Sequence, residues 1–123
     1  MDRTFLLIGA LAGFVGVMFG AFGAHALRNR LSPDMLAVFE TGVRYQMYHA
    51  FALLVVAVAA ARFDGWLVRA AGWAFSAGIV LFSGSLYLLA LGAPRAFGLV
   101  TPFGGVSFIA AWVTLAIGVL TRT

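Results

Sequence analysis

Long apolar stretches alternate with short polar breaks along the whole chain. The first stretch, residues 5–27, contains no charged residue, and about twenty helical residues are enough to cross a hydrocarbon core of about 30 Å. Polar breaks follow at 28–34, 63–66 and 92–100, and an apolar stretch resumes after each one. The pattern predicts an all-α integral membrane bundle in one domain, 1–123. Its four transmembrane helices are expected at about 5–27, 42–62, 69–91 and 102–120.

The second predicted span is preceded by an amphipathic stretch. Ser32, Pro33 and Asp34 form a helix-start signal, with a capping residue, a proline and an acid in the first turn. Leu36 and Phe39 begin an apolar stripe that continues at the same helical spacing. We therefore expect the first third of this helix to lie along the membrane interface before it turns inward, with a bend near residue 42.

Small residues recur at helical spacing in two of the predicted spans. In the first span they are the glycines Gly9, Gly13, Gly16, Gly20 and Gly23. In the fourth span they are Ser107, Ala111, Thr114 and Gly118. Such rows let neighbouring helix backbones approach closely in lipid. We expect the first helix to be the hub against which the others pack, and the first and fourth helices to be in contact.

Composition agrees with a membrane protein and excludes several other classes. Hydrophobic residues make up 63% of the chain, and the mean hydropathy is +1.05, which is outside the range of soluble domains. The net charge of +4 comes from eight arginines that form no basic face, so a nucleic-acid partner is not expected. The chain has no cysteine, which excludes a thiolate metal site and a cysteine nucleophile.

Four spans place both ends of the chain on one side of the membrane. Arginines near the span ends number four on each side, so the positive-inside rule gives a tie. Partial burial of Arg44 against Glu40 would favour cytoplasmic termini in a multi-pass plasma (inner) membrane protein. Residues 24–26 fit a signal-peptide cleavage pattern, but the apolar run is too long for one, so we expect the first helix to be retained.

Polar residues within the predicted spans gather in the half of the bundle nearest the first and third breaks. They are His25, Glu40, Arg44, Tyr45, Gln46, His49, Ser83, Ser85, Tyr87, Thr101 and Ser107. Polar groups buried in a membrane are costly and need partners. This intramembrane polar cluster is therefore the candidate site.

Each member of the cluster also has a structural interpretation. Glu40 and Arg44 are spaced for a helix ion pair, which we favour over a proton or substrate relay. Two histidines fall short of the three or four ligands that a metal needs, so interhelical hydrogen bonding is favoured over metal or haem. Ser83 and Ser85 do not stand in a G-x-S-x-G motif, and close packing explains them better than nucleophilic catalysis. We expect no enzyme activity and no cofactor.

Four segments resemble a known family. They are GAFGAHAL at 20–27, TGVRYQMYHAFALL at 41–54, LFSGSLYLLAL at 81–91 and TPFGGVSFIAAW at 101–112. They are similar to the signature segments of domain-of-unknown-function family 423, the YgdD/YwdK-type small bacterial membrane proteins. The resemblance covers nearly the whole chain and implies a four-span inner-membrane protein. It assigns no catalytic residues, because no activity is established for the family.

Three functions from different classes stay open at this point. The first is a non-enzymatic protein that supports membrane integrity or modulates a partner by helix packing. Its expected partners are membrane lipids, a second copy or another membrane protein. The second is a small oligomeric transporter or channel that uses a polar half-pocket around His25, Glu40, Arg44 and His49. The third is a haem or quinone enzyme, which would carry a redox-active group.

Overall fold

The computed structural model describes residues 3–122, and within this range helices account for nearly all of the chain. The elements are α1 (Thr4–Met18), η1 (Phe19–Gly23), α2 (Ala24–Leu27), α3 (Pro33–Arg62), α4 (Trp66–Gly78), η2 (Ile79–Ser83), α5 (Gly84–Ala90), η3 (Arg95–Leu99) and α6 (Thr101–Thr121). They join into four helical runs, Thr4–Leu27, Pro33–Arg62, Trp66–Ala90 and Arg95–Thr121, each long and apolar enough to cross a membrane. The predicted all-α fold with four spans is confirmed.

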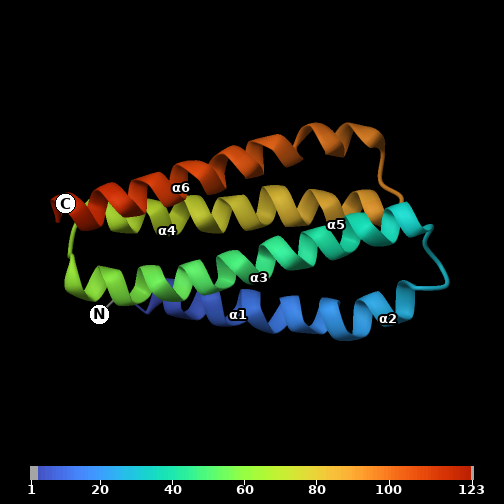
Figure 1. Ribbon diagram of the computed structural model, residues 1–123, viewed down its shortest axis with the longest axis horizontal. Helices are drawn as coiled ribbons and strands as arrows, with labels where there is room; N and C mark the ends of the chain where they lie inside the picture. The colour runs from blue at the N-terminus through green and yellow to red at the C-terminus, as the bar shows by residue number, and fades with distance from the viewer. Residues whose placement is uncertain (1–2, 123) are drawn as a thin grey trace.

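The four helical runs lie side by side in the order in which they occur along the chain (Figure 1). α1 packs against α3, α3 packs against α4 and α5, and α4 packs against α6. The segments that connect the helical runs, 28–32, 63–65 and 91–94, are short. Short connections favour contact between consecutive helices. α1 begins and α6 ends at the same end of the molecule. The arrangement is thus an up-down row in which α1 and α6 form the two edges.

The hub of the bundle is α3, so the prediction that the first helix has this role is wrong. Half of the most apolar 18-residue stretch of α3 is buried, compared with 17% of the corresponding stretch of the first helix. The helix α3 has neighbours on two sides, whereas α1 lies at an edge. Buried alanines such as Ala50, Ala52 and Ala57 allow the close approach. A row of small residues marks where one backbone is approached, but it does not show how many neighbours a helix has.

The glycine row of the first helix faces α3, except at one position. Gly9 and Gly16 are buried, and a Cβ atom at Gly20 or Gly23 would lie 3.1 Å from a side chain of α3. A Cβ atom at Gly13 would meet nothing within 4 Å. Four residues of an α-helix turn the chain by about 400°, so Gly13 lies about 40° around the helix from Gly9, at the rim of the side that faces α3. Gly13 therefore does not pack against α3, and its part in packing with another chain stays a prediction.

The small residues of the last helix face α4 rather than the first helix. The Ser107 hydroxyl donates to the Ala74 carbonyl of α4 at 2.7 Å. Ala111 is fully buried, and a Cβ atom at Gly118 would lie 3.1 Å from Val68 of α4. Thr114 is only partly buried. The predicted contact between the first and fourth helices is wrong, because these helices form opposite edges of the row.

The amphipathic stretch before the second span belongs to the same helix as the span itself. The Ser32 side chain caps α3 by accepting from the Met35 amide at 3.2 Å. The helix then continues through Gly42 without a break. Phe39 is 3% exposed, and Gly42 lies against the Tyr87 ring. These contacts hold the first third of α3 inside the bundle, and no break marks the expected bend at residue 42. Its position relative to the membrane interface stays a prediction.

Two wide helical turns interrupt the first and third helical runs. η1 and η2 are π-helical turns of five residues each. Turns of this type shift the side chains that follow them around the helix, and they are frequent at functional sites. Neither turn is predicted by the sequence, because no proline or characteristic residue pair marks it.

Candidate functional site

The buried polar side chains form separate contacts between helices. The Tyr87 hydroxyl of α5 donates to the Gln46 side-chain oxygen of α3 at 2.6 Å. The Gln46 amide nitrogen in turn donates to the Ala12 carbonyl of α1 at 2.8 Å. Gln46 is 4% exposed. This chain of two hydrogen bonds links three helices.

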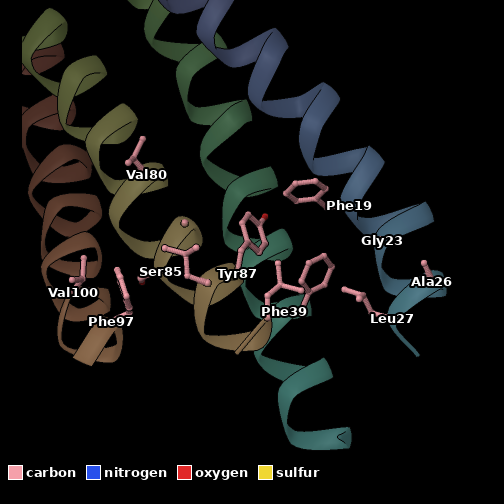
Figure 2. A pocket seen from close by; sticks show the side chains of 13 residues that line it. Phe19, Gly23, Ala26, Leu27, Phe39, Val80, Ser85, Tyr87, Phe97 and Val100 are labelled. Atoms are coloured by element: carbon pink, nitrogen blue, oxygen red, sulfur yellow. The ribbon is translucent and has the colours of Figure 1, made fainter. Parts of the chain in front are cut away.

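Aromatic rings surround the Tyr87 end of this chain. The Tyr87 ring lies 5.0 Å from Phe19 and 5.3 Å from Phe39, measured between ring centroids. Figure 2 shows these three rings close together, each coming from a different helical run. Phe19 belongs to η1, so the first wide turn places one of the three rings. The aromatic contacts keep the tyrosine hydroxyl directed at Gln46.

Three hydroxyl side chains join other pairs of helices. Ser83, which is fully buried, donates to the Gly42 carbonyl of α3 at 2.6 Å. Ser85 donates to the Phe82 carbonyl at 2.9 Å and shares a short hydrogen bond with the Thr101 hydroxyl at the start of α6. Ser107 donates to α4, as described above. Both serine hydroxyls donate to backbone carbonyls and neither is paired with a side chain that could act as a general base.

His49 joins α3 to α6 as a neutral imidazole. Its Nδ1 atom lies 2.6 Å from the Tyr45 carbonyl, and its Nε2 atom lies 3.2 Å from the Trp112 indole nitrogen. Because indole N–H only donates, Nε2 accepts and Nδ1 carries the proton. The ring stacks on Phe108 with centroids 3.5 Å apart. Both ring nitrogens are therefore engaged, and neither is open to a metal or a substrate.

The side chains of four members of the predicted cluster lie outside these hydrogen bonds. His25, Glu40, Arg44 and Tyr45 are exposed. The predicted Glu40–Arg44 ion pair does not form, whereas in the part of the chain that the structure describes Arg69 pairs with Asp64 at 3.5 Å. An ion pair on a helix surface contributes only a few tenths of a kcal/mol, so little holds Glu40 and Arg44 together. Arg44 is not buried against Glu40, and the argument from it for cytoplasmic termini loses its support.

The buried polar side-chain atoms of residues 3–122 all have partners. Within residues 3–122, no group of three His, Asp or Glu side chains comes together as a metal site would require. No buried side-chain nitrogen or oxygen in this range lacks a hydrogen-bond partner. The buried polar side chains of this range thus make contacts within the chain.

Sequence reasoning missed the partners in these contacts. Trp112 is not among the residues of the predicted polar cluster, although its N–H needs a partner wherever the indole is partly buried. The carbonyls of Ala12, Gly42 and Ala74 carry no sequence signal, because every residue has one. Only the neighbouring helix decides which carbonyl is reached.

The hydrogen bond from Ser83 to Gly42 allows a matched test. Ser83→Ala is expected to lower the free energy of unfolding by about 1 kcal/mol, since an interhelical hydrogen bond in a membrane protein contributes about 0.6 to 2 kcal/mol. Ser76→Ala removes a hydroxyl that donates within its own helix to Gly72 and should change the value by less than about 0.3 kcal/mol. Unfolding in mixed micelles with increasing dodecyl sulfate measures both. Equal effects of the two substitutions would contradict the assignment.

The fold and the contacts define a class of small α-helical membrane protein that crosses the membrane four times and uses its buried polar groups to join its own helices. A family model described as a protein of unknown function (DUF423) matches residues 19–105. The chain belongs to this family, as the resemblance implied.

Named relatives are similar over almost their whole length. The chain is 45% identical over 116 residues to the UPF0382 membrane protein YwdK of Bacillus subtilis, with 94% of each chain covered. It is 41% identical over 120 residues to the UPF0382 inner membrane protein YgdD of Escherichia coli, covering 97% of this chain and 91% of YgdD. No solved structure matches the chain.

Proposed function

We propose that this protein has no catalytic activity and acts by helix packing in the plasma (inner) membrane. Through this packing it modulates a partner membrane protein or supports membrane integrity. The proposal is supported by the polar side chains, which are engaged in contacts within the chain wherever they are buried in residues 3–122. Catalysis needs polar groups that are held ready for a substrate, and the bundle offers none in its described core.

The proposal rests on the outer face of α1, which is the side that points away from α3. The helix lies at an edge of the row (Figure 1), and only 17% of its most apolar 18-residue stretch is buried within the chain. Gly13 lies at the rim between this face and the side that faces α3, with nothing within 4 Å of an added Cβ atom. The neighbouring Phe14 is 63% exposed. A bare backbone beside a large apolar ring suits close packing with another helix, so the partner is a second copy or another membrane protein.

No observation favours the transporter or channel hypothesis. That hypothesis requires His25, Glu40, Arg44 and His49 to share one polar pocket. His49 is buried and paired with Trp112, whereas the other three are exposed. We therefore do not propose transport.

Replacing Gly13 with leucine tests the packing proposal. A Cβ atom at this position meets nothing within 4 Å, so the larger side chain starts from open space on α1. We expect a complex isolated from native membranes by mild detergent to shift to the single chain, with the thermal unfolding midpoint unchanged. Ala110→Leu adds the same side chain to an exposed position on α6 and should leave the complex intact. If the Gly13→Leu protein migrates with its partner as the unchanged protein does, α1 is not the packing surface.

We also propose that both termini lie on one side of the membrane, because α1 begins and α6 ends at the same end of the molecule (Figure 1). Green fluorescent protein fused before residue 1 or after residue 123 should give the same result, either both fluorescent or both dark, and alkaline phosphatase fused at the same two places should give the opposite result. One fluorescent and one dark fusion would contradict the proposal, and two fluorescent fusions would place both termini in the cytoplasm.

A further inference from the structure

An apolar groove lies between the first and second halves of the chain at the end where α2 and α5 finish. Its volume is about 700 Å³, which is within the range of small-molecule sites, roughly 300–1,000 Å³. Phe39 of α3 and Tyr87 of α5 lie between its two sides (Figure 2). Leu27 lies on the side of α2, and Phe97 lies on the side of η3.

The lining of the groove requires a hydrocarbon occupant. Ser85 and Tyr87 are the only lining residues with polar side chains. The Ser85 hydroxyl is paired with Thr101 and the Phe82 carbonyl. The Tyr87 hydroxyl donates to Gln46. No polar side-chain atom of the lining is therefore left to bind a polar ligand.

The length of the groove matches one leaflet of a bilayer. Its wall along the first helical run extends from Phe19 in η1 to Leu27 at the end of α2. At 1.5 Å per residue this wall is about 12 Å long, compared with about 15 Å for half of a hydrocarbon core. The wide turns contribute Phe19 and Gly23 on one side and Val80 on the other. A groove of this depth that is open to lipid accommodates acyl chains of the adjoining leaflet.

Three arginines lie close in sequence to lining residues at the end of the groove. Arg28 directly follows the lining residue Leu27, and Arg30 lies two residues further on. Arg95 begins η3, two residues before the lining residue Phe97. All three are exposed, and none forms an ion pair within residues 3–122. Guanidinium groups bind phosphate oxygens with two parallel hydrogen bonds.

Acidic residues at this end do not cancel the arginines. Asp34 in the first turn of α3 and Glu40 are the carboxylates there, and both are exposed. Four arginines lie at this end, the three just described and Arg44, so positive charges outnumber the two carboxylates. The surface around the groove is thus positive, and basic pockets between transmembrane helices are known to bind anionic headgroups.

We propose that this groove holds the acyl chains of an anionic phospholipid, whose phosphate is bound by Arg28, Arg30 and Arg95. The apolar lining selects hydrocarbon, and the arginines select the charge of the headgroup. The assignment is independent of any partner on α1, because the groove and the outer face of α1 share no lining residue.

Native mass spectrometry of the full chain with added phosphatidylglycerol or phosphatidylcholine of the same acyl composition tests the proposal. The unchanged protein should retain one phosphatidylglycerol and prefer it to phosphatidylcholine. Arg28→Gln/Arg95→Gln should weaken phosphatidylglycerol binding about 25-fold, at about fivefold for each arginine, and leave phosphatidylcholine binding unchanged. The matched control, Arg3→Gln/Arg122→Gln, changes exposed arginines at the opposite end and should bind phosphatidylglycerol as before.

A second variant tests the hydrocarbon part of the site. A Cβ atom at Gly84 would meet nothing within 4 Å, although Gly84 lines the groove. Gly84→Leu should therefore fill the groove and lower binding of both lipids at least fivefold, while the thermal unfolding midpoint stays unchanged. If it fails to fold, Val80→Trp replaces it, because Val80 lines the groove and is 69% exposed.

Three results would overturn the proposal. The first is equal retention of the two lipids by the unchanged protein. The second is the same loss of phosphatidylglycerol in the control variant as in Arg28→Gln/Arg95→Gln, which would show a general effect of charge. The third is a dimer that retains no lipid and dissociates on Gly84→Leu, which would show that a second copy of the chain fills the groove.

Discussion

Gly104→Ala is expected to lower the free energy of unfolding by about 3 kcal/mol, at the upper end of the usual cost of overpacking. A Cβ atom at Gly104 would lie 2.7 Å from the Phe82 Cα atom, in the backbone of η2. A backbone atom cannot rotate away as the tip of a side chain can. The substitution must therefore push α6 away from η2, and Phe82 and Phe108, whose ring centroids are 5.6 Å apart, would separate.

The neighbouring glycine gives the matched control. A Cβ atom at Gly105 would lie 3.9 Å from the Phe82 ring, which is ordinary contact. Gly105→Ala should change the free energy of unfolding by less than about 0.5 kcal/mol, the usual range for a substitution that creates no clash. Unfolding in mixed micelles, followed by far-ultraviolet circular dichroism, measures both variants. If Gly104→Ala is as stable as Gly105→Ala, α6 does not pack against η2 as described.

Gln46→Leu is expected to lower the free energy of unfolding by about 2 kcal/mol. The substitution removes the hydrogen bonds to Tyr87 and to the Ala12 carbonyl. It also strands the Tyr87 hydroxyl in an apolar surrounding, and an unpaired buried polar group costs about 1–3 kcal/mol. Leucine keeps the apolar contacts of the side chain, so the decrease in the free energy of unfolding measures the lost hydrogen bonds.

A double-mutant cycle separates the stranded hydroxyl from the lost contacts. Tyr87→Phe alone should cost about 1 kcal/mol. The double variant Gln46→Leu/Tyr87→Phe should cost less than the sum of the single ones, because no hydroxyl is then left without a partner. Strict additivity of the two losses would show that Tyr87 and Gln46 do not interact in the membrane-inserted protein.

The helices of this protein could be predicted from the sequence because their signals are local. A charge-free run from residue 5 to 27 is a span by length alone. Ser32 and Pro33 start a helix by their own chemistry, and the structure shows Ser32 capping α3. Signals of this kind lie within a single segment of the chain, so no knowledge of the neighbouring helices is needed.

The neighbours of each helix could not be predicted, because a small residue indicates that a backbone is approached closely but not which helix approaches it. Ser107 and Gly118 were correctly seen as packing positions, but they meet α4 and not the first helix. The row of five glycines suggested a hub, whereas the alanines of α3 mark the real one. Glycine signals are easily noticed, but buried alanines look the same as exposed ones in an alanine-rich chain.

The polar cluster was predicted as one site because its members share one half of the bundle. A helix presents its side chains around its whole circumference, so neighbours in sequence point in different directions. Arg44 is exposed, whereas Gln46 and His49 are buried and reach different helices. The two wide turns at η1 and η2 add a further rotation that the sequence does not signal.

Photocrosslinking at position 14 tests most directly whether the outer face of α1 binds a partner. Phe14 is 63% exposed on this face, and a benzophenone-bearing phenylalanine analogue fits there without disturbing the core. Phe103, which is 71% exposed on α6 at the opposite edge, gives the matched control. We predict a crosslinked product in native membranes from position 14 and little from position 103, and its mass will tell a second copy from another protein. No product from position 14, or equal products from both positions, would contradict the proposal.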